Sequence, residues 1–332
     1  MTLNSNLNRR RFIQSTAAGV AVLSTPSILY AQGYPSGPVT IVCGFSPGGT
    51  TDALARMVAN YMSQKFGQPF VVENITGAAG TIGMTSVANA EPDGQTLLFT
   101  AVGQIAVSPH TFPGLTVDPV NGLEHISMLA EGDFVLTVNP EVPVQNIAEF
   151  IALAKEKPNS MFYGTAGAGG NLHLFLEAFL LAADVKLKGV HYSGGSALMP
   201  DVLNNQVQLA LSSYPVAGPQ IEAGNLRPLL IIGKQRNANL PDVPTAAEAG
   251  LPELSTLNDW FGLHAPAGTP DSIIQALAEG MKEAAETDEI KARLQSGALR
   301  TAASTPEEFR ARIEKDFEYY GRVAKEANVI VQ

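Results

Sequence analysis

The chain has 332 residues, of which 31 are acidic and 21 basic, and a formal net charge of −10 at neutral pH. Nucleic acids and anionic membranes are bound through basic surfaces, so this charge balance disfavours both as partners. Cys43 is the single cysteine, which excludes an intramolecular disulfide, and its strand-like surroundings predict a buried thiol.

The first 31 residues have the pattern of an export signal. Three consecutive arginines, Arg9 to Arg11, precede an interrupted apolar stretch that runs to Leu29 and ends at a small residue, Ala31. Paired arginines before a weak apolar segment are typical of twin-arginine signals, which export folded proteins. The longest uninterrupted apolar run of this stretch, Ala17 to Leu23, is far shorter than the ~20 residues needed to span a bilayer, which disfavours a membrane anchor. We expect cleavage after Ala31 and export of the remainder.

Short β-branched runs then alternate with amphipathic helical patterns, which predicts an α/β fold. Strands are expected at 39–43, 68–73, 96–100, 126–129 and 134–138. A helix is expected after the first strand, because Leu54, Val58 and Met62 recur at helical spacing. Gly132 separates the last two apolar runs, and we expect the chain to cross there from one lobe to a second.

The second lobe is expected to repeat this order. A strand at 160–163 leads into a glycine-rich loop at 164–170, and Leu172, Phe175 and Phe179 indicate the helix that follows. Further strands are expected at 207–211 and 229–232, and at 260–263 after the chain has returned to the first lobe. The expected division is therefore residues 34–130 and 237–332 in lobe 1, and residues 131–236 in lobe 2.

Two C-terminal helices are expected to begin after threonine–proline pairs. Thr269 and Thr305 each place a capping hydroxyl before a proline that starts a helix. Glu308 completes a capping box with Thr305. Both helices are expected to be structural.

The two glycine loops, at 45–52 and 164–170, each lie between a strand and a helix. Glycine lets a backbone approach a ligand closely, and the unpaired N–H groups of the following helix favour an anion. Neither loop contains Lys or Arg, so backbone N–H groups and hydroxyls would hold the anion. Four hydrogen bonds to a charged group supply about 6–12 kcal/mol, whereas micromolar affinity needs about 8 kcal/mol. A tight strand–helix turn is an equal alternative for either loop alone.

Residues 44–48 also match the G-x-S-x-G elbow of serine hydrolases, with Ser46 as the nucleophile. The next residue, Pro47, has no N–H to donate to an oxyanion, so hydrolysis by Ser46 is kept only as a remote alternative. The five histidines are scattered without metal-ligand spacing, and no complete nucleotide-binding loop is present. We therefore expect a binding protein rather than an enzyme, with no metal and no cofactor.

A series of ordered motifs resembles the Bug family, the periplasmic receptors of tripartite tricarboxylate transporters. They are FSPGGTTD at 45–52, VEN at 72–74, PDGQTLL at 92–98, YSGG at 192–195, LPDVPT at 240–245 and WFG at 260–262. The resemblance covers residues 34–332. It implies a type II periplasmic-binding-protein fold, with two α/β lobes joined by crossover strands that close around a ligand in the cleft.

The resemblance also implies which residues bind. In this family the two loops hold one carboxylate, and Asp52 is expected to order its loop rather than to touch the anion. A departure from the family is Gly170, where a hydroxyl residue is usual; Asn171 is expected to cap the helix instead. The site expected from these matches comprises Phe45, Gly48, Gly49, Thr50 and Asp52 in the first loop, Gly164, Thr165, Gly167, Gly169, Asn171 and His173 in the second, and Gln104, Tyr192 and Ser213 for selectivity at the distal end.

The expected function is that of a monomeric periplasmic receptor, which captures a di- or tricarboxylate, an acidic amino acid or an aromatic acid for a membrane transporter. A ligand-dependent partner of a membrane sensor kinase is the alternative. Both would use the same cleft, so the sequence does not separate them.

Overall fold

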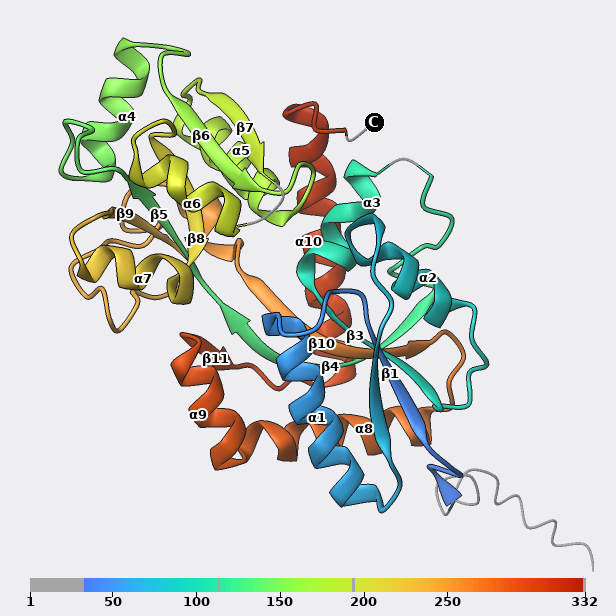
Figure 1. Ribbon diagram of the computed structural model, residues 1–332. Coiled ribbons are helices and arrows are strands. Elements are labelled where there is room, and N and C mark those ends of the chain that lie inside the picture. Colours follow the sequence, from blue (N-terminus) through green and yellow to red (C-terminus); the bar gives the residue numbers. More distant parts are fainter. Residues whose placement is uncertain (1–32, 113, 193–194, 331–332) are drawn as a thin grey trace, which may run out of the picture.

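The computed structural model describes residues 33–112, 114–192 and 195–330, which form two α/β lobes (Figure 1). The expected export signal lies outside the described residues. Within the described part, no helix is long and apolar enough to cross a membrane.

The first lobe is built on a six-stranded sheet with the strand order β11-β4-β10-β3-β1-β2. The first three strands of the chain are parallel, whereas β10 and β4 are antiparallel to each other. The strands are β1 (Val39–Cys43), β2 (Phe70–Asn74), β3 (Thr96–Ala101), β4 (Leu123–Gly132), β10 (Asp259–Pro266) and β11 (Leu299–Thr301).

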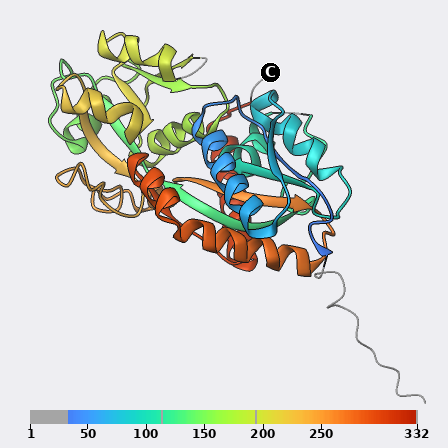
Figure 2. The ribbon, with the colours of Figure 1, turned by 60° about the horizontal axis from the view of Figure 1, so that its bottom comes forward.

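Helices cover both faces of this sheet. On one face, α1 and α8 bury their apolar sides against the strands, where Ile41, Leu54 and Leu277 belong to one core cluster (Figure 2). Cys43 is fully buried, as expected. The helical segments of this lobe are α1 (Thr50–Phe66), η2 (Ala78–Gly80), α2 (Thr81–Ala88), η3 (Gly103–Val107), α3 (Ser108–Thr111), α8 (Asp271–Glu286), α9 (Asp288–Ser296) and α10 (Pro306–Glu326).

The second lobe is built on a five-stranded sheet with the order β7-β6-β8-β5-β9. Its strands are β5 (Phe134–Val138), β6 (Phe162–Ala166), β7 (Lys188–Tyr192), β8 (Leu209–Ser213) and β9 (Arg227–Ile232). Its helices are α4 (Ile147–Glu156), α5 (Asn171–Ala183), α6 (Gly195–Leu203) and α7 (Tyr214–Glu222).

Two crossings join the sheets. The chain leaves the first sheet at Gly132 and enters the second at Phe134, so only Asp133 separates β4 from β5. It re-enters the first sheet at Asp259. The segment before this return still lies on the second sheet, where Ala246 N–H donates to the Ile231 carbonyl at 2.9 Å. We therefore propose to move the second lobe boundary from residue 237 to Asn258.

The two predicted helix caps have different outcomes. Thr305 caps α10 in a full capping box with Glu308, as expected. The prediction for Thr269 is wrong: Pro270 is the N-cap residue of α8, and the Thr269 hydroxyl donates to the Pro266 carbonyl at 2.8 Å. The Thr269 hydroxyl is therefore bonded within the turn that precedes α8 and does not cap the helix.

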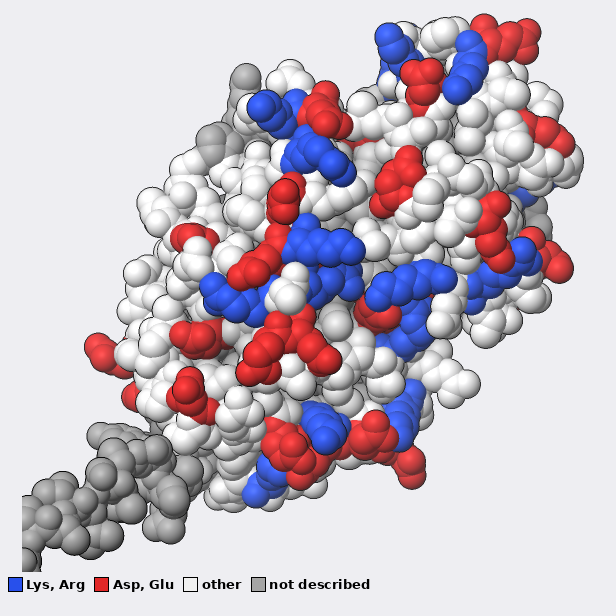
Figure 3. Space-filling model, turned by 180° about the vertical axis from the view of Figure 1, so that it is seen from behind, with Lys and Arg blue, Asp and Glu red and all other residues white. Residues whose placement is uncertain are grey.

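The back face of the molecule carries mixed charge. Figure 3 shows lysine and arginine side chains interspersed with aspartate and glutamate over this face. Among the described residues of this face, the basic side chains near the middle have acidic side chains beside them.

Candidate functional site

A cleft of about 660 Å³ lies between the lobes. Its walls include Thr50 and Phe261 from the first lobe and Asn171 and Ser213 from the second. Most of the other lining side chains are apolar, so the cleft offers a few polar groups within an apolar enclosure.

The first glycine loop is held in shape by Asp52, whose side chain is almost fully buried. Its carboxylate accepts the Gly48 N–H at 2.9 Å and the Asn74 amide at 2.8 Å, and it pairs with Arg56 at 2.9 Å. The Asn74 amide also donates to the Phe45 carbonyl. Burial opposes ionisation of Asp52, but these partners outweigh it and lower its pKa. Its charge is satisfied within the loop, which is the ordering role expected of it.

Two helices begin at the cleft without a side-chain cap. Gly49 is the N-cap residue of α1 and Gly170 that of α5, and neither position provides a capping hydrogen bond. Asn171 was expected to cap α5, and this prediction is wrong: Asn171 is the first helical residue, and its Oδ1 accepts the adjacent Leu172 N–H. The first N–H groups of a helix have no intrahelical acceptor and carry the positive end of the helix dipole. Two such ends, one from each lobe, therefore face one cleft.

The second glycine loop is supported from behind. His173 accepts the Gly169 N–H on its Nδ1 at 3.0 Å and is buried. The Thr165 hydroxyl is fully buried and lies 3.2 Å from the Gly167 carbonyl. Thr111, at the end of α3, donates to the Gly169 carbonyl at 2.7 Å and so joins the two lobes. His173 and Thr165 thus position the loop, whereas Gly167 itself lines the cleft.

The residues expected for distal selectivity separate in space. Ser213 lines the cleft at the end of β8. Gln104 is fully buried and donates to the Gly80 carbonyl at 2.9 Å, and Tyr192 donates to Asp201 at 2.6 Å. Of the expected site residues, the structure places these on the cleft wall: Phe45, Thr50, Gly167, Asn171 and Ser213. The other expected residues are not part of this wall: Gly48, Gly49, Asp52, Gln104, Gly164, Thr165, Gly169, His173 and Tyr192.

Three charged residues that the sequence did not single out also line the cleft: Asp133, Asp259 and Arg293. Asp133 is paired with Arg300. Asp259 has a buried Oδ1 without a hydrogen-bond partner among the described residues, and burial raises its pKa to about 7. The backbone N–H groups of Trp260 and Val102 oppose this shift only in part.

The alternative of a serine hydrolase finds no support around Ser46. In the described part of the chain, no hydrogen bond joins the Ser46 hydroxyl to a histidine or a carboxylate. The described residues likewise contain no group of three or more His, Cys, Asp or Glu side chains placed to hold a metal.

Two α/β lobes, crossing strands and a cleft between the lobes define a protein of the periplasmic-binding-protein class. The sequence of residues 54–329 matches the family model described as "Tripartite tricarboxylate transporter family receptor". The chain therefore belongs to this family. It is therefore a solute-binding receptor rather than an enzyme, and the family expected from the motifs is confirmed.

Known proteins are similar to this chain in sequence and in structure over most of its length. BugT of Bordetella pertussis is 29% identical over 96% of this chain and 98% of its own. The structure of R. palustris Rpa4515 with adipate is 30% identical, with a TM-score of 0.77 over 90% of this chain and 100% of that one. MatC from Rhodopseudomonas palustris with bound malate is 28% identical, with a TM-score of 0.74 over 87% of this chain and 99% of that one. These matches confirm the expected fold class.

Proposed function

We propose that this receptor captures a small carboxylate in its cleft and delivers it to the membrane subunits of a tripartite transporter. The observation that carries the proposal is the pair of uncapped helix starts, at Gly49 and Gly170, that face one cleft from different lobes. Helix N-termini bind anions through their free N–H groups and their dipoles. The adipate of Rpa4515 and the malate of MatC belong to the same chemical class.

The geometry supplies the binding free energy without a cation in either loop. Hydrogen bonds to a charged group contribute about 1.5–3 kcal/mol each, and each helix end adds about 0.3–1 kcal/mol. Asp52, His173 and Thr165 hold the two loops in place, so little ordering remains to be done when the anion arrives. Because the carboxylate contacts both lobes, its binding favours the closed arrangement, which the membrane subunits would then recognise.

The proposal also covers the cellular location and the oligomeric state of the mature protein. The arginine-led segment before Ala31 supports export and removal of residues 1–31. The mature receptor would act in the periplasm as a monomer.

The test is a thermal-shift screen of residues 32–332 against dicarboxylates, tricarboxylates, acidic amino acids and aromatic acids, with the methyl ester of each hit as its control. A ligand at 100 times its dissociation constant stabilises the folded protein by about 2.7 kcal/mol. At least one acid should raise the melting temperature while its fully esterified form does not. Equal shifts with acid and ester, or no shift with any acid, would contradict the proposal.

A further inference from the structure

The described cleft wall carries two acidic side chains and one basic side chain, and one of the two acids is already paired with a base. The charged residues of the described wall are Asp133, Asp259 and Arg293. Asp133 is neutralised by its pair with Arg300. Asp259 carries a full negative charge only part of the time near neutral pH, because burial raises its pKa to about 7.

Arg293 is the basic residue of this wall, and it has no acidic partner. Among the described residues, no Asp or Glu oxygen lies within 4 Å of its guanidinium. Arg293 is exposed, and among the described residues its guanidinium makes one hydrogen bond, a weak one from Nη1 to the Ser296 hydroxyl at 3.4 Å. An arginine on a cleft wall with most of its donors free is suited to binding a planar anion such as a carboxylate.

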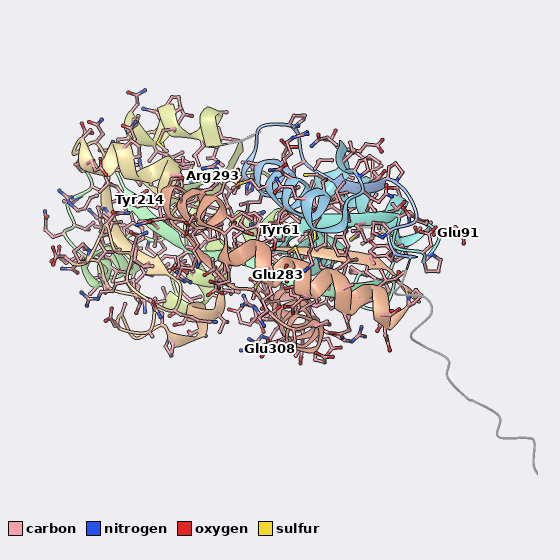
Figure 4. All side chains as sticks on the ribbon, turned by 90° about the horizontal axis from the view of Figure 1, so that it is seen from below. Tyr61, Glu91, Tyr214, Glu283, Arg293 and Glu308 are labelled. Carbon is pink, nitrogen blue, oxygen red and sulfur yellow. The ribbon has the colours of Figure 1, made fainter. Side chains whose placement is uncertain are left out.

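The position of Arg293 differs from that of the anion-binding helix starts. It lies in the last turn of α9, where Ser296 and Leu299 continue the same wall. The start of α7 supplies Pro215 and Val216 to the wall from the other lobe. Figure 4 shows Arg293 on the first lobe and Tyr214, the first residue of α7, on the second. A ligand with one anionic group at the helix starts and a second at Arg293 would use both parts of the wall.

The wall also includes large apolar side chains. Leu54 and Phe261 come from the first lobe, and Phe134 and Leu211 from the second. Val216, at the start of α7, is 45% exposed and adds to this apolar lining. Such a lining would pack against methylene groups and offers little to a ligand with many hydroxyl or amino groups.

We propose that Arg293 is a specificity-determining residue, which binds the second carboxylate of an α,ω-dicarboxylate whose first carboxylate lies at the starts of α1 and α5. This inference rests on the proposed function, because it assumes that a carboxylate occupies the helix starts. It assigns the ligand class as two terminal carboxylates joined by a methylene chain.

The test is isothermal titration calorimetry of residues 32–332 with dicarboxylates of four to eight carbons and with the monocarboxylates of equal length. The variants are Arg293→Gln and, as a matched control, Lys291→Gln. Lys291 lies on the same helix, pairs with Glu286 and is not part of the cleft wall. Both substitutions remove one positive charge, so long-range electrostatic effects on the ligand are similar.

Loss of one charge-assisted hydrogen-bond pair weakens binding by about ten- to hundredfold. Arg293→Gln should therefore lower the affinity for the preferred dicarboxylate by that factor. It should change the affinity for the matched monocarboxylate less than twofold. Lys291→Gln should leave both affinities unchanged.

Two results would overturn the inference while leaving the proposed function in place. One is an equal effect of Arg293→Gln on mono- and dicarboxylates; the other is an equal effect of the two substitutions. Failure of the parent protein to bind any dicarboxylate of the series would also overturn the inference, whereas the proposed function is overturned only if the wider carboxylate screen gives no shift either.

Discussion

Asp259 provides the sharpest test of the electrostatics of the cleft. Its carboxylate lies on the cleft wall at the point where the chain re-enters the first sheet, and its Oδ1 is buried without a partner among the described residues. Asp259→Asn keeps the shape of the side chain and removes its ability to ionise. The amide oxygen remains available to the backbone N–H groups of Trp260 and Val102.

The expected effect depends on pH. Burial raises the pKa of Asp259 to about 7, whereas the unfolded chain has the ordinary value near 4. Between these values the folded protein holds a proton that the unfolded chain releases, so the associated stability is present at low pH and is lost as pH rises from about 4 to 7. Three pKa units correspond to about 4 kcal/mol, and water in the open cleft reduces this to about 2–4 kcal/mol.

Burial and the backbone N–H groups of Trp260 and Val102 determine the pKa of Asp259, and both are the same in parent and variant. The nearby Tyr320 on α10 is likewise unchanged. Comparison of the variant with its parent at each pH therefore isolates the contribution of Asp259.

The assay is urea unfolding of parent and variant at pH 4, 5.5, 7 and 8.5. Asp259→Asn should match the parent at pH 4 and exceed it by about 2–4 kcal/mol at pH 8.5. Asp242→Asn, at an exposed position, is the control and should show no such trend. A stability difference that is constant with pH, or a variant that is less stable at pH 8.5, would refute the reasoning.

The remaining predictions concern one loop, one helix and one buried pair. Asp52→Ala leaves Gly48 N–H without its acceptor and should destabilise the fold by about 1–3 kcal/mol and weaken carboxylate binding at least tenfold; unchanged calorimetric affinity would count against an ordering role. Thr305→Ala should cost about 1 kcal/mol in urea unfolding, and Thr301→Ala, at an exposed strand end, almost nothing; equal costs would deny the capping box. Burial lowers the pKa of His125 to about 4 and that of its neighbour His264 further, so their imidazole NMR signals should not titrate between pH 7.5 and 5; a midpoint near 6.5 would contradict the buried geometry.

The free energy of unfolding should also depend on the protonation of these two histidines. Because the folded pKa of His125 lies below its unfolded value, its contribution to stability is present above pH 6.5 and is lost as pH falls towards 4. The pKa shift of His125 corresponds to about 3 kcal/mol of stability, which is lost as the pH falls. This loss opposes the stability that protonation of Asp259 adds over the same pH range.

Local sequence patterns predicted much of the fold. A fully buried strand reads as an unbroken apolar run, and β1 and β5 have the bounds that the sequence indicates. The elements that the sequence did not indicate lack such a signal. β7 is a polar edge strand with exposed side chains, and β11 has three residues that extend only because they pair with β4. Pro200 and Pro219 interrupt the helical pattern of α6 and α7.

The candidate site was predictable only where a local feature defines it. Glycines between a strand and a helix mark a tight turn that ends at a helix start, so both loops could be located from the sequence. The direction of a side chain is a property of the folded chain, which is why His173 and Thr165 were expected in the site but lie behind it. Arg293 and Asp259 had no local signal, because Arg293 reads as an ordinary surface charge and the burial of Asp259 depends on neighbours far away in sequence.

The most direct test of the central claim compares a carboxylate with its own neutral form. Calorimetry on residues 32–332 would measure the dissociation constants of the best acid from the screen and of its fully esterified derivative. If the helix starts at Gly49 and Gly170 hold a carboxylate through charge-assisted hydrogen bonds, esterification should weaken binding by about a hundredfold or more. An ester that binds as tightly as the acid would contradict the account.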